Sequence, residues 1–197
     1  MYKKQMLFQK ILCIAMLIVA TITFIYALGV MTDVYDGLFW TITDPEDPEL
    51  DMVEGARIYI DMQHFNDTLV GLTIGFILVA LTLFVTLSNS RRKYYISNYV
   101  ATIATVVYGI ALSAWAMGQI GYYKAEYLKV NMEQLELYAK IFQRPVIHNT
   151  RWFTAGYAVF AIVIVFSLIL VANLVWKILL MKKESQLLSN NKEGVTA

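Results

Sequence analysis

The stretch between Asp67 and Lys124 constrains the fold most, because its 56 positions carry only three charges, the adjacent cations Arg91, Arg92 and Lys93. Charged side chains are expelled from hydrocarbon and gather where water returns. Two apolar helices joined by a short basic turn satisfy this pattern, since about 20 helical residues cross the roughly 30 Å hydrocarbon layer. Basic residues in short loops favour the cytoplasmic side, so these three residues predict an inner turn and set the topology.

Two further apolar runs flank this pair of helices, and only 16% of the 197 residues are charged, where a soluble domain carries about a quarter. The sequence therefore predicts an all-α integral membrane four-helix bundle with both termini cytoplasmic. The expected transmembrane domain is residues 1–183, with spans at about 11–31, 68–88, 95–121 and 152–176, outer segments at 33–67 and 122–151, and a flexible cytoplasmic tail at 184–197.

The first apolar run has two interpretations. Ala27, Leu28 and Gly29 resemble a small-residue cleavage site, so the run is either a retained anchor or a cleavable signal peptide. Its length exceeds the usual signal core of about 7 to 15 residues, which favours a retained anchor. The single cysteine, Cys13, excludes an intramolecular disulfide.

Charge is segregated along the chain. Residues 33–67 hold ten acids and one base, residues 124–151 hold three acids and five bases, and the other ten bases and two acids fall in the inner segments. This distribution agrees with the positive-inside rule. Lys177, Lys182 and Lys183 are expected to end the fourth span at the inner face, and Trp152 and Trp176 to anchor its two ends.

Hydrophobic periodicity continues outside two of the spans. Ile58, Met62, Phe65 and Leu69 predict that the second helix begins before it enters lipid. After the third span, the period of 3.6 residues predicts a helix that extends on the outer side to about Gln143. Its apolar stripe is expected to dock on the first outer loop, the bilayer surface or another protein, and its members are Leu128, Met132, Leu135 and Phe142.

Small residues predict where helices pack closely. Gly71 and Gly75 lie four residues apart in the second span, which lets another helix of the chain or of a partner approach. The third span repeats the pattern over a longer distance, so it is expected to be the central helix. Its small residues are Ala101, Thr105, Gly109 and Ser113.

Motifs of enzymes, cofactor sites and metal sites are missing from the sequence, so no catalytic, cofactor-binding or metal residue is predicted. Asp61, His64 and Asp67 share a helical face and His148 precedes the fourth span, but each group holds one histidine, and hydrogen bonds to loop backbone are the favoured role of both histidines. Three amides lie in or near the spans and are interpreted as interhelical hydrogen-bonding residues rather than a substrate path: Asn98, Gln119 and Asn173.

The segment from Ser90 to Tyr99 and the segment from Asp61 to Asn66 carry a family resemblance. They resemble uncharacterised four-span membrane proteins of Gram-positive bacteria, whose genes tend to lie beside carbohydrate ABC transporter permeases and binding proteins. The resemblance implies an accessory subunit of a sugar-uptake assembly in a bacterial plasma membrane. It assigns no site residues.

Three functions are compatible with these features. The favoured one is a non-enzymatic accessory or scaffold subunit of a larger membrane complex, because packing seams and an outer amphipathic helix occur without translocation groups in the spans. The alternatives are a self-associating small channel or carrier and a membrane sensor with an acidic outer loop. The expected partners are membrane lipid and other integral membrane subunits, such as ABC transporter permeases or further copies of the chain, with no nucleic acid and no cofactor.

Overall fold

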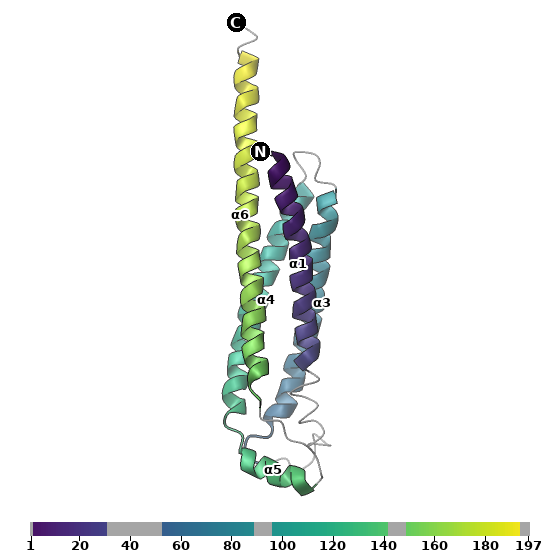
Figure 1. Ribbon diagram of the computed structural model, residues 1–197, viewed down its shortest axis with the longest axis vertical. Helices are drawn as coiled ribbons and strands as arrows, with labels where there is room; N and C mark the ends of the chain where they lie inside the picture. Colours follow the sequence, from purple (N-terminus) through teal and green to yellow (C-terminus); the bar gives the residue numbers. More distant parts are fainter. Residues whose placement is uncertain (1, 31–52, 89–95, 142–148, 194–197) are drawn as a thin grey trace. The chain divides into compact units, whose positions relative to one another are not determined.

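The computed structural model describes residues 2–30, 53–88, 96–141 and 149–193. Within these ranges all regular secondary structure is α-helical, as the sequence predicts. The helices are α1 (Tyr2–Val30), α3 (Ile58–Ser88), α4 (Ile96–Tyr127), α5 (Met132–Ile141) and α6 (Arg151–Glu193) (Figure 1).

Four of these helices are long and apolar enough to cross a membrane. A bilayer requires about 20 helical residues, and each of the four exceeds that length. The chain is therefore a multi-pass membrane protein built as an all-α four-helix bundle, and the predicted number of spans is confirmed. The helical segments with this length and apolar composition, called the spanning segments below, are Lys3–Gly29, Ile58–Leu87, Ile96–Tyr127 and Arg151–Leu187.

Helix α3 begins at Ile58, outside the apolar run that starts near residue 68, as its periodicity predicts. A turn at residues 53–57 precedes it. The four periodic residues are all buried, so this extension packs against the rest of the chain: Ile58, Met62, Phe65 and Leu69. Most of the acidic first outer segment, residues 31–52, lies outside the described residues.

The third membrane helix extends past its expected span but does not continue to Gln143, so that prediction is wrong. Helix α4 ends at Tyr127, and a new helix, α5, begins at Met132. In the turn between them the Lys129 ammonium donates a hydrogen bond of 2.5 Å to Glu126. This hydrogen bond and the charge of Glu126 raise the pKa of Lys129.

Asn131 explains the break. Its side-chain Oδ1 accepts a hydrogen bond from the backbone N–H of Gln134 at 3.2 Å, which is the geometry of a helix N-cap. Its own backbone N–H donates to the carbonyl oxygen of Glu54 at 3.0 Å. Next to this contact, Gly55 has a φ of 81° and an added Cβ there would lie 3.1 Å from Val130 Cα. The turn at residues 53–57, before α3, therefore packs against the start of α5 and fixes its position.

Helix α6 reaches Glu193, so the first ten residues of the segment expected to be a flexible tail are helical. Neither glycine nor proline occurs between Gly156 and Gly194, and the residues after Lys183 are mostly good helix formers. The helix therefore continues past the apolar run. Residues 194–197 lie outside the described residues.

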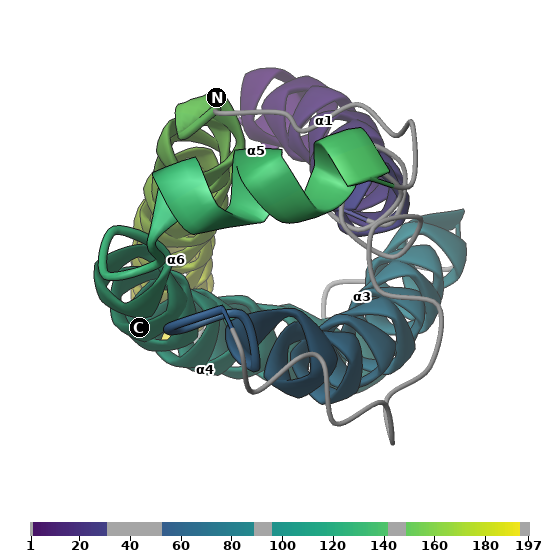
Figure 2. The same ribbon diagram turned by 90° about the horizontal axis from the view of Figure 1, so that it is seen from below.

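The chain packs as two compact units. Unit 1 consists of residues 1–20, 76–110 and 163–197, and unit 2 consists of residues 21–75 and 111–162. Each unit contains segments of α1, α3, α4 and α6, and α5 belongs to unit 2. In unit 2, α5 runs crosswise to the longer helices (Figure 2).

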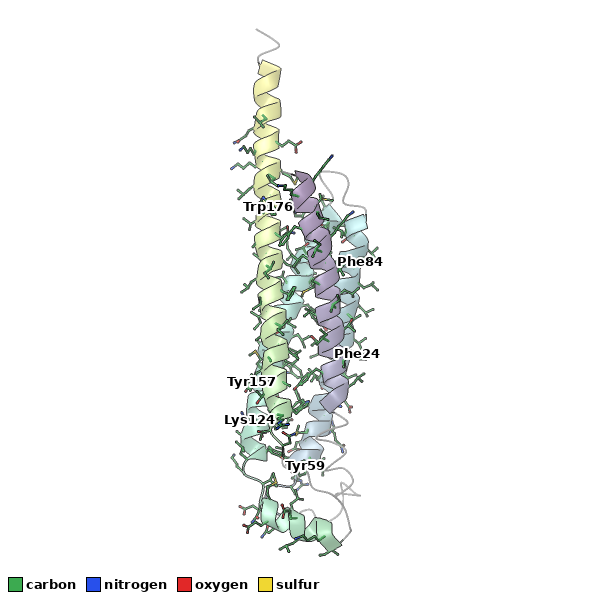
Figure 3. The ribbon with its side chains drawn as sticks, in the orientation of Figure 1. Phe24, Tyr59, Phe84, Lys124, Tyr157 and Trp176 are labelled. Carbon is green, nitrogen blue, oxygen red and sulfur yellow. The ribbon has the colours of Figure 1, made fainter. Side chains whose placement is uncertain are left out.

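Gly109 lies where α3, α4 and α6 pack closely in the apolar core of unit 1. A Cβ added at Gly109 would lie 2.9 Å from Ser167 Oγ and 3.3 Å from both Phe76 and Val163. Such distances leave no room for a methyl group, so α4 approaches α3 and α6 closely at this residue. Trp176 projects from α6 at the outside of the unit, where its ring lies 6.2 Å from that of Phe8 (Figure 3).

Aromatic rings fill the core of unit 2. Tyr26 stacks on Trp152 with ring centroids 5.2 Å apart, and its hydroxyl donates to the Trp152 carbonyl oxygen at 3.4 Å. Trp152 is buried, so its expected role as an interfacial anchor is wrong, whereas Trp176 is exposed. Gly156 makes room for Tyr26, because a Cβ there would overlap the Tyr26 hydroxyl and lie 2.7 Å from Ile120 Cδ1.

Candidate functional site

Five polar side chains are buried together in unit 1, and we call them the amide–lysine cluster. Each is less than 5% exposed. Because buried polar groups are costly in a membrane unless they are hydrogen-bonded, such a concentration is the strongest candidate for a site in the described chain. Its members are Gln5 and Gln9 of α1, Asn98 of α4, and Asn173 and Lys177 of α6.

Asn98 is the centre of this cluster. Its Oδ1 accepts two hydrogen bonds, one from Gln9 Nε2 at 2.6 Å and one from the Lys177 ammonium at 3.1 Å. Its Nδ2 donates to Thr86 Oγ1 of α3 at 3.4 Å. One side chain of α4 therefore connects all of the other three long helices within unit 1.

Gln5 connects α1 with α6. Its Nε2 lies 3.2 Å from both Gln9 Oε1 and Asn173 Oδ1 and donates to both. Its Oε1 is buried and has no hydrogen-bond donor. Asn98 and Asn173 thus take part in interhelical hydrogen bonds, as the sequence predicts, while the third amide of that prediction, Gln119, is half-buried in unit 2.

Lys177 does not end the fourth span at the inner face, and that prediction is wrong. Its side chain turns inward and is 4% exposed. Besides Asn98, the ammonium contacts the face of the Tyr99 ring, 4.9 Å from its centroid. Cation–π attraction is stronger in a desolvated site than at a surface, and contributes about 2 kcal/mol there. The Tyr99 hydroxyl in turn donates to Met181 Sδ at 2.7 Å.

The positive charge of Lys177 faces neutral dipoles rather than a carboxylate. Salt bridges among the described residues include none to Lys177, and the only acids in the sequence of unit 1 are Glu184 and Glu193. A buried ammonium costs several kcal/mol of desolvation when it lacks a partner of opposite charge. The hydrogen bond to Asn98 and the Tyr99 ring offset part of that cost.

The predicted packing residues of the third span all lie in the interior. Ala101, Thr105, Gly109 and Ser113 are buried, as a close-packed helix face requires. The seam of the second span differs. Gly71 is exposed, and a Cβ added there would meet nothing within 4 Å, while Gly75 is half-buried. Among the described residues, Gly71 therefore sets no close helix contact.

The predicted docking residues have different environments. Leu128 is 66% exposed and Met132 is half-buried, but Leu135 is fully buried in unit 2, which excludes it from contact with a partner. Two other residues of α5, Leu137 and Ile141, are 62% and 75% exposed. Phe142 lies outside the described residues.

The remaining candidates do not form a site. Asp61, His64 and Asp67 are exposed on α3, and within the described ranges no three His, Cys, Asp or Glu side chains converge as metal ligands would. The topology residues Arg91, Arg92 and Lys93 lie outside the described residues, as does His148.

Sequence reasoning missed Gln5, Gln9 and Lys177 as members of the cluster. A signal was present, since Gln5 and Gln9 are four residues apart on one helical face, as are Asn173 and Lys177. Two polar pairs of this spacing, both near the inner ends of predicted spans, indicate facing partners.

The chain matches no protein-family model, no curated protein and no solved structure.

Proposed function

We propose that this protein is a non-enzymatic accessory or scaffold subunit of a larger complex in a bacterial plasma membrane, with a carbohydrate ABC transporter as the complex that the sequence resemblance favours. The observation that carries the proposal is the apolar surface outside the four spanning segments. Leu128, Leu137 and Ile141 are large apolar side chains, each more than 60% exposed. Leu137 and Ile141 belong to α5, and we call these two residues the α5 surface, whereas Leu128 lies before α5 begins.

The α5 surface is unusual for its place in the chain. Apolar side chains on the spanning helices face lipid and need no protein partner, but residues 128–141 follow the end of the third spanning segment. Leu137 and Ile141 are one helical turn apart and lie on the same face of α5. Exposed apolar groups that cluster at a surface favour contact with another protein.

Gly71 supports the same proposal from the membrane segment. Its surface is exposed and open, and glycines at lipid-facing positions let a helix of another subunit approach closely. The polar groups of unit 1 are joined to one another by hydrogen bonds across four helices, which favours a packed bundle over a continuous polar path.

The test is purification of the tagged full-length chain from its native membrane in mild detergent, followed by identification and quantification of the proteins that accompany it. Permeases or an ATPase should be purified together with the tagged chain in a fixed ratio. The double substitution Leu137→Glu and Ile141→Glu should remove them, whereas Lys140→Glu on the same helix, which also changes an exposed residue, should not.

Recovery of the chain alone as a homo-oligomer would contradict the proposal and favour the channel or carrier. Flux of ions or sugars into liposomes that contain only this chain would then be measured. Unchanged recovery with the double variant would remove the α5 surface from the proposal.

A further inference from the structure

The amide–lysine cluster has unused hydrogen-bonding capacity of two opposite kinds. Gln5 Oε1 is an acceptor in a side chain that is 0% exposed, and it has no donor. The Lys177 ammonium has three N–H donors, of which one is directed to Asn98 Oδ1. A ligand that satisfies both groups must bring an anionic oxygen to Lys177 and an O–H or N–H to Gln5.

The two groups belong to one connected set of side chains. Gln5 donates to Asn173, which lies one helical turn before Lys177 on α6, and Gln9 and Lys177 both donate to Asn98. Gln5 is also in the first turn of α1, which begins at Tyr2.

The charge of unit 1 favours an anion. Residues 1–20, 76–110 and 163–197 contain ten Lys and Arg residues and two acids. A basic pocket between membrane helices on the cytoplasmic side is a typical binding site for anionic head groups. Lys177 is buried, whereas Lys3, Lys4, Lys10, Lys182 and Lys183 are exposed around the same ends of α1 and α6.

We propose that Lys177 and Gln5 bind a phosphate group that carries a proton, with the ammonium paired to a phosphate oxygen and Gln5 Oε1 accepting the hydrogen bond of the P–OH. Such a group occurs in inorganic phosphate and in phosphomonoesters such as the head group of phosphatidic acid, whose second pKa is about 6, so the protonated form is abundant at about pH 6, where the test is made. Phosphodiester head groups and sulfate have no proton on the anionic group near neutral pH, so they satisfy Lys177 but not Gln5.

The test uses the full-length chain in nanodiscs and measures its apparent Tm. In phosphatidylcholine discs, inorganic phosphate is compared with sulfate at equal ionic strength. In a second arm, discs with phosphatidic acid are compared with discs with phosphatidylmethanol, an anionic diester that has no hydroxyl group. A ligand well above its Kd should raise the Tm by roughly 5 °C.

A phosphate response in phosphatidylcholine assigns the site to free phosphate, and a response only to phosphatidic acid assigns it to the lipid head group. Lys177→Met should abolish either response, and Lys182→Met, an exposed lysine of the same helix, should leave it unchanged. If Lys177→Met does not fold, Gln5→Leu decides, because it should remove the preference for phosphate over sulfate and keep a response to both.

If neither phosphate nor phosphatidic acid raises the Tm, the proposal is overturned. Equal rises in Tm with sulfate and with phosphate in the unmodified chain would also overturn it. So would a loss of the response in Lys182→Met as large as the loss in Lys177→Met. Both results indicate nonspecific screening of surface charge. None of these outcomes depends on whether the chain is an accessory subunit.

Discussion

The Lys177 ammonium donates a hydrogen bond of 3.1 Å to Asn98 Oδ1, and both side chains are buried in unit 1. A lysine of a membrane helix usually extends its ammonium toward water. Here the ammonium turns inward to an oxygen that also accepts a hydrogen bond from Gln9. The arrangement joins α1, α4 and α6 through one neutral side chain.

Replacement of Asn98 by alanine should destabilise the bundle. The substitution removes the acceptor of both Gln9 and Lys177, and an unpaired buried charge has a large cost, so we expect a loss of about 3 kcal/mol. Unfolding of the purified chain in detergent measures it. Asn98→Asp is the matched variant, because a carboxylate keeps an oxygen facing Lys177 and adds a negative charge. It should be more stable than Asn98→Ala, and the reverse order would show that Lys177 does not depend on this contact.

Gly109→Ala should destabilise unit 1 by about 1 to 3 kcal/mol, because the new methyl group would lie 2.9 Å from Ser167 Oγ and 3.3 Å from Phe76 and Val163. Gly71→Ala and Gly118→Ala are matched controls. An added Cβ meets nothing within 4 Å at either position, so the stability of the isolated chain should stay the same or increase slightly. Thermal unfolding of the three variants compares them directly.

A second substitution separates crowding from other effects of Gly109→Ala. Ser167 Oγ is the nearest atom to the new methyl group, and it is buried without a hydrogen-bond partner. Ser167→Ala should therefore cost little by itself and restore part of the stability of Gly109→Ala. Strict additivity of the two substitutions would contradict a direct contact between these positions.

Gly156→Ala should destabilise unit 2, because the added methyl group would overlap the Tyr26 hydroxyl and crowd Ile120. We expect a loss of about 1 to 3 kcal/mol from overpacking. Tyr26→Phe removes the hydroxyl oxygen and should recover part of the loss, although it also removes the hydrogen bond to the Trp152 carbonyl oxygen. Unfolding followed by tryptophan fluorescence measures both variants, and no recovery in the double variant would place the strain at Ile120.

Asn131→Ala should loosen α5 without unfolding the spanning helices. The substitution removes the N-cap hydrogen bond to Gln134, which is worth about 0.5 to 2 kcal/mol. Hydrogen exchange of residues 132–141 should accelerate, while exchange in α4 should not change. Asn131→Asp keeps a capping oxygen and is the control. Uniform acceleration across the chain would mean that α5 is coupled to the whole fold.

The apolar pattern alone predicts the helical class and the number of spans. Hydrocarbon admits backbone only where its hydrogen bonds are satisfied locally, so long uncharged runs must be helices. Periodicity also predicts that α3 begins near Ile58, and the small residues of α4 predict its close packing at Gly109. Each of these properties depends on residues close together in the sequence.

Helix ends and buried partners depend on contacts between distant residues. The hydrophobic periodicity continues through residues 128–142 and does not show that a new helix, α5, begins at Met132. That start depends on the hydrogen bond of Asn131 to Glu54, which is distant in the sequence. Leu135 has the pattern of a docking residue, yet unit 2 buries it. Trp152 has the position of an interfacial anchor, and the approach of Tyr26 to Gly156 places it in an aromatic core instead.

Lys177 shows the difference between what local sequence determines and what tertiary contacts determine. The sequence by itself determined that this residue belongs to an apolar helix in a chain that crosses the membrane four times. Only the tertiary structure decided that its ammonium points into the bundle, because the acceptor, Asn98, is 79 residues away and the ring that covers the charge belongs to another helix. Local pattern fixes which segments are helical in lipid, whereas the partners of buried polar groups are fixed by how the helices pack.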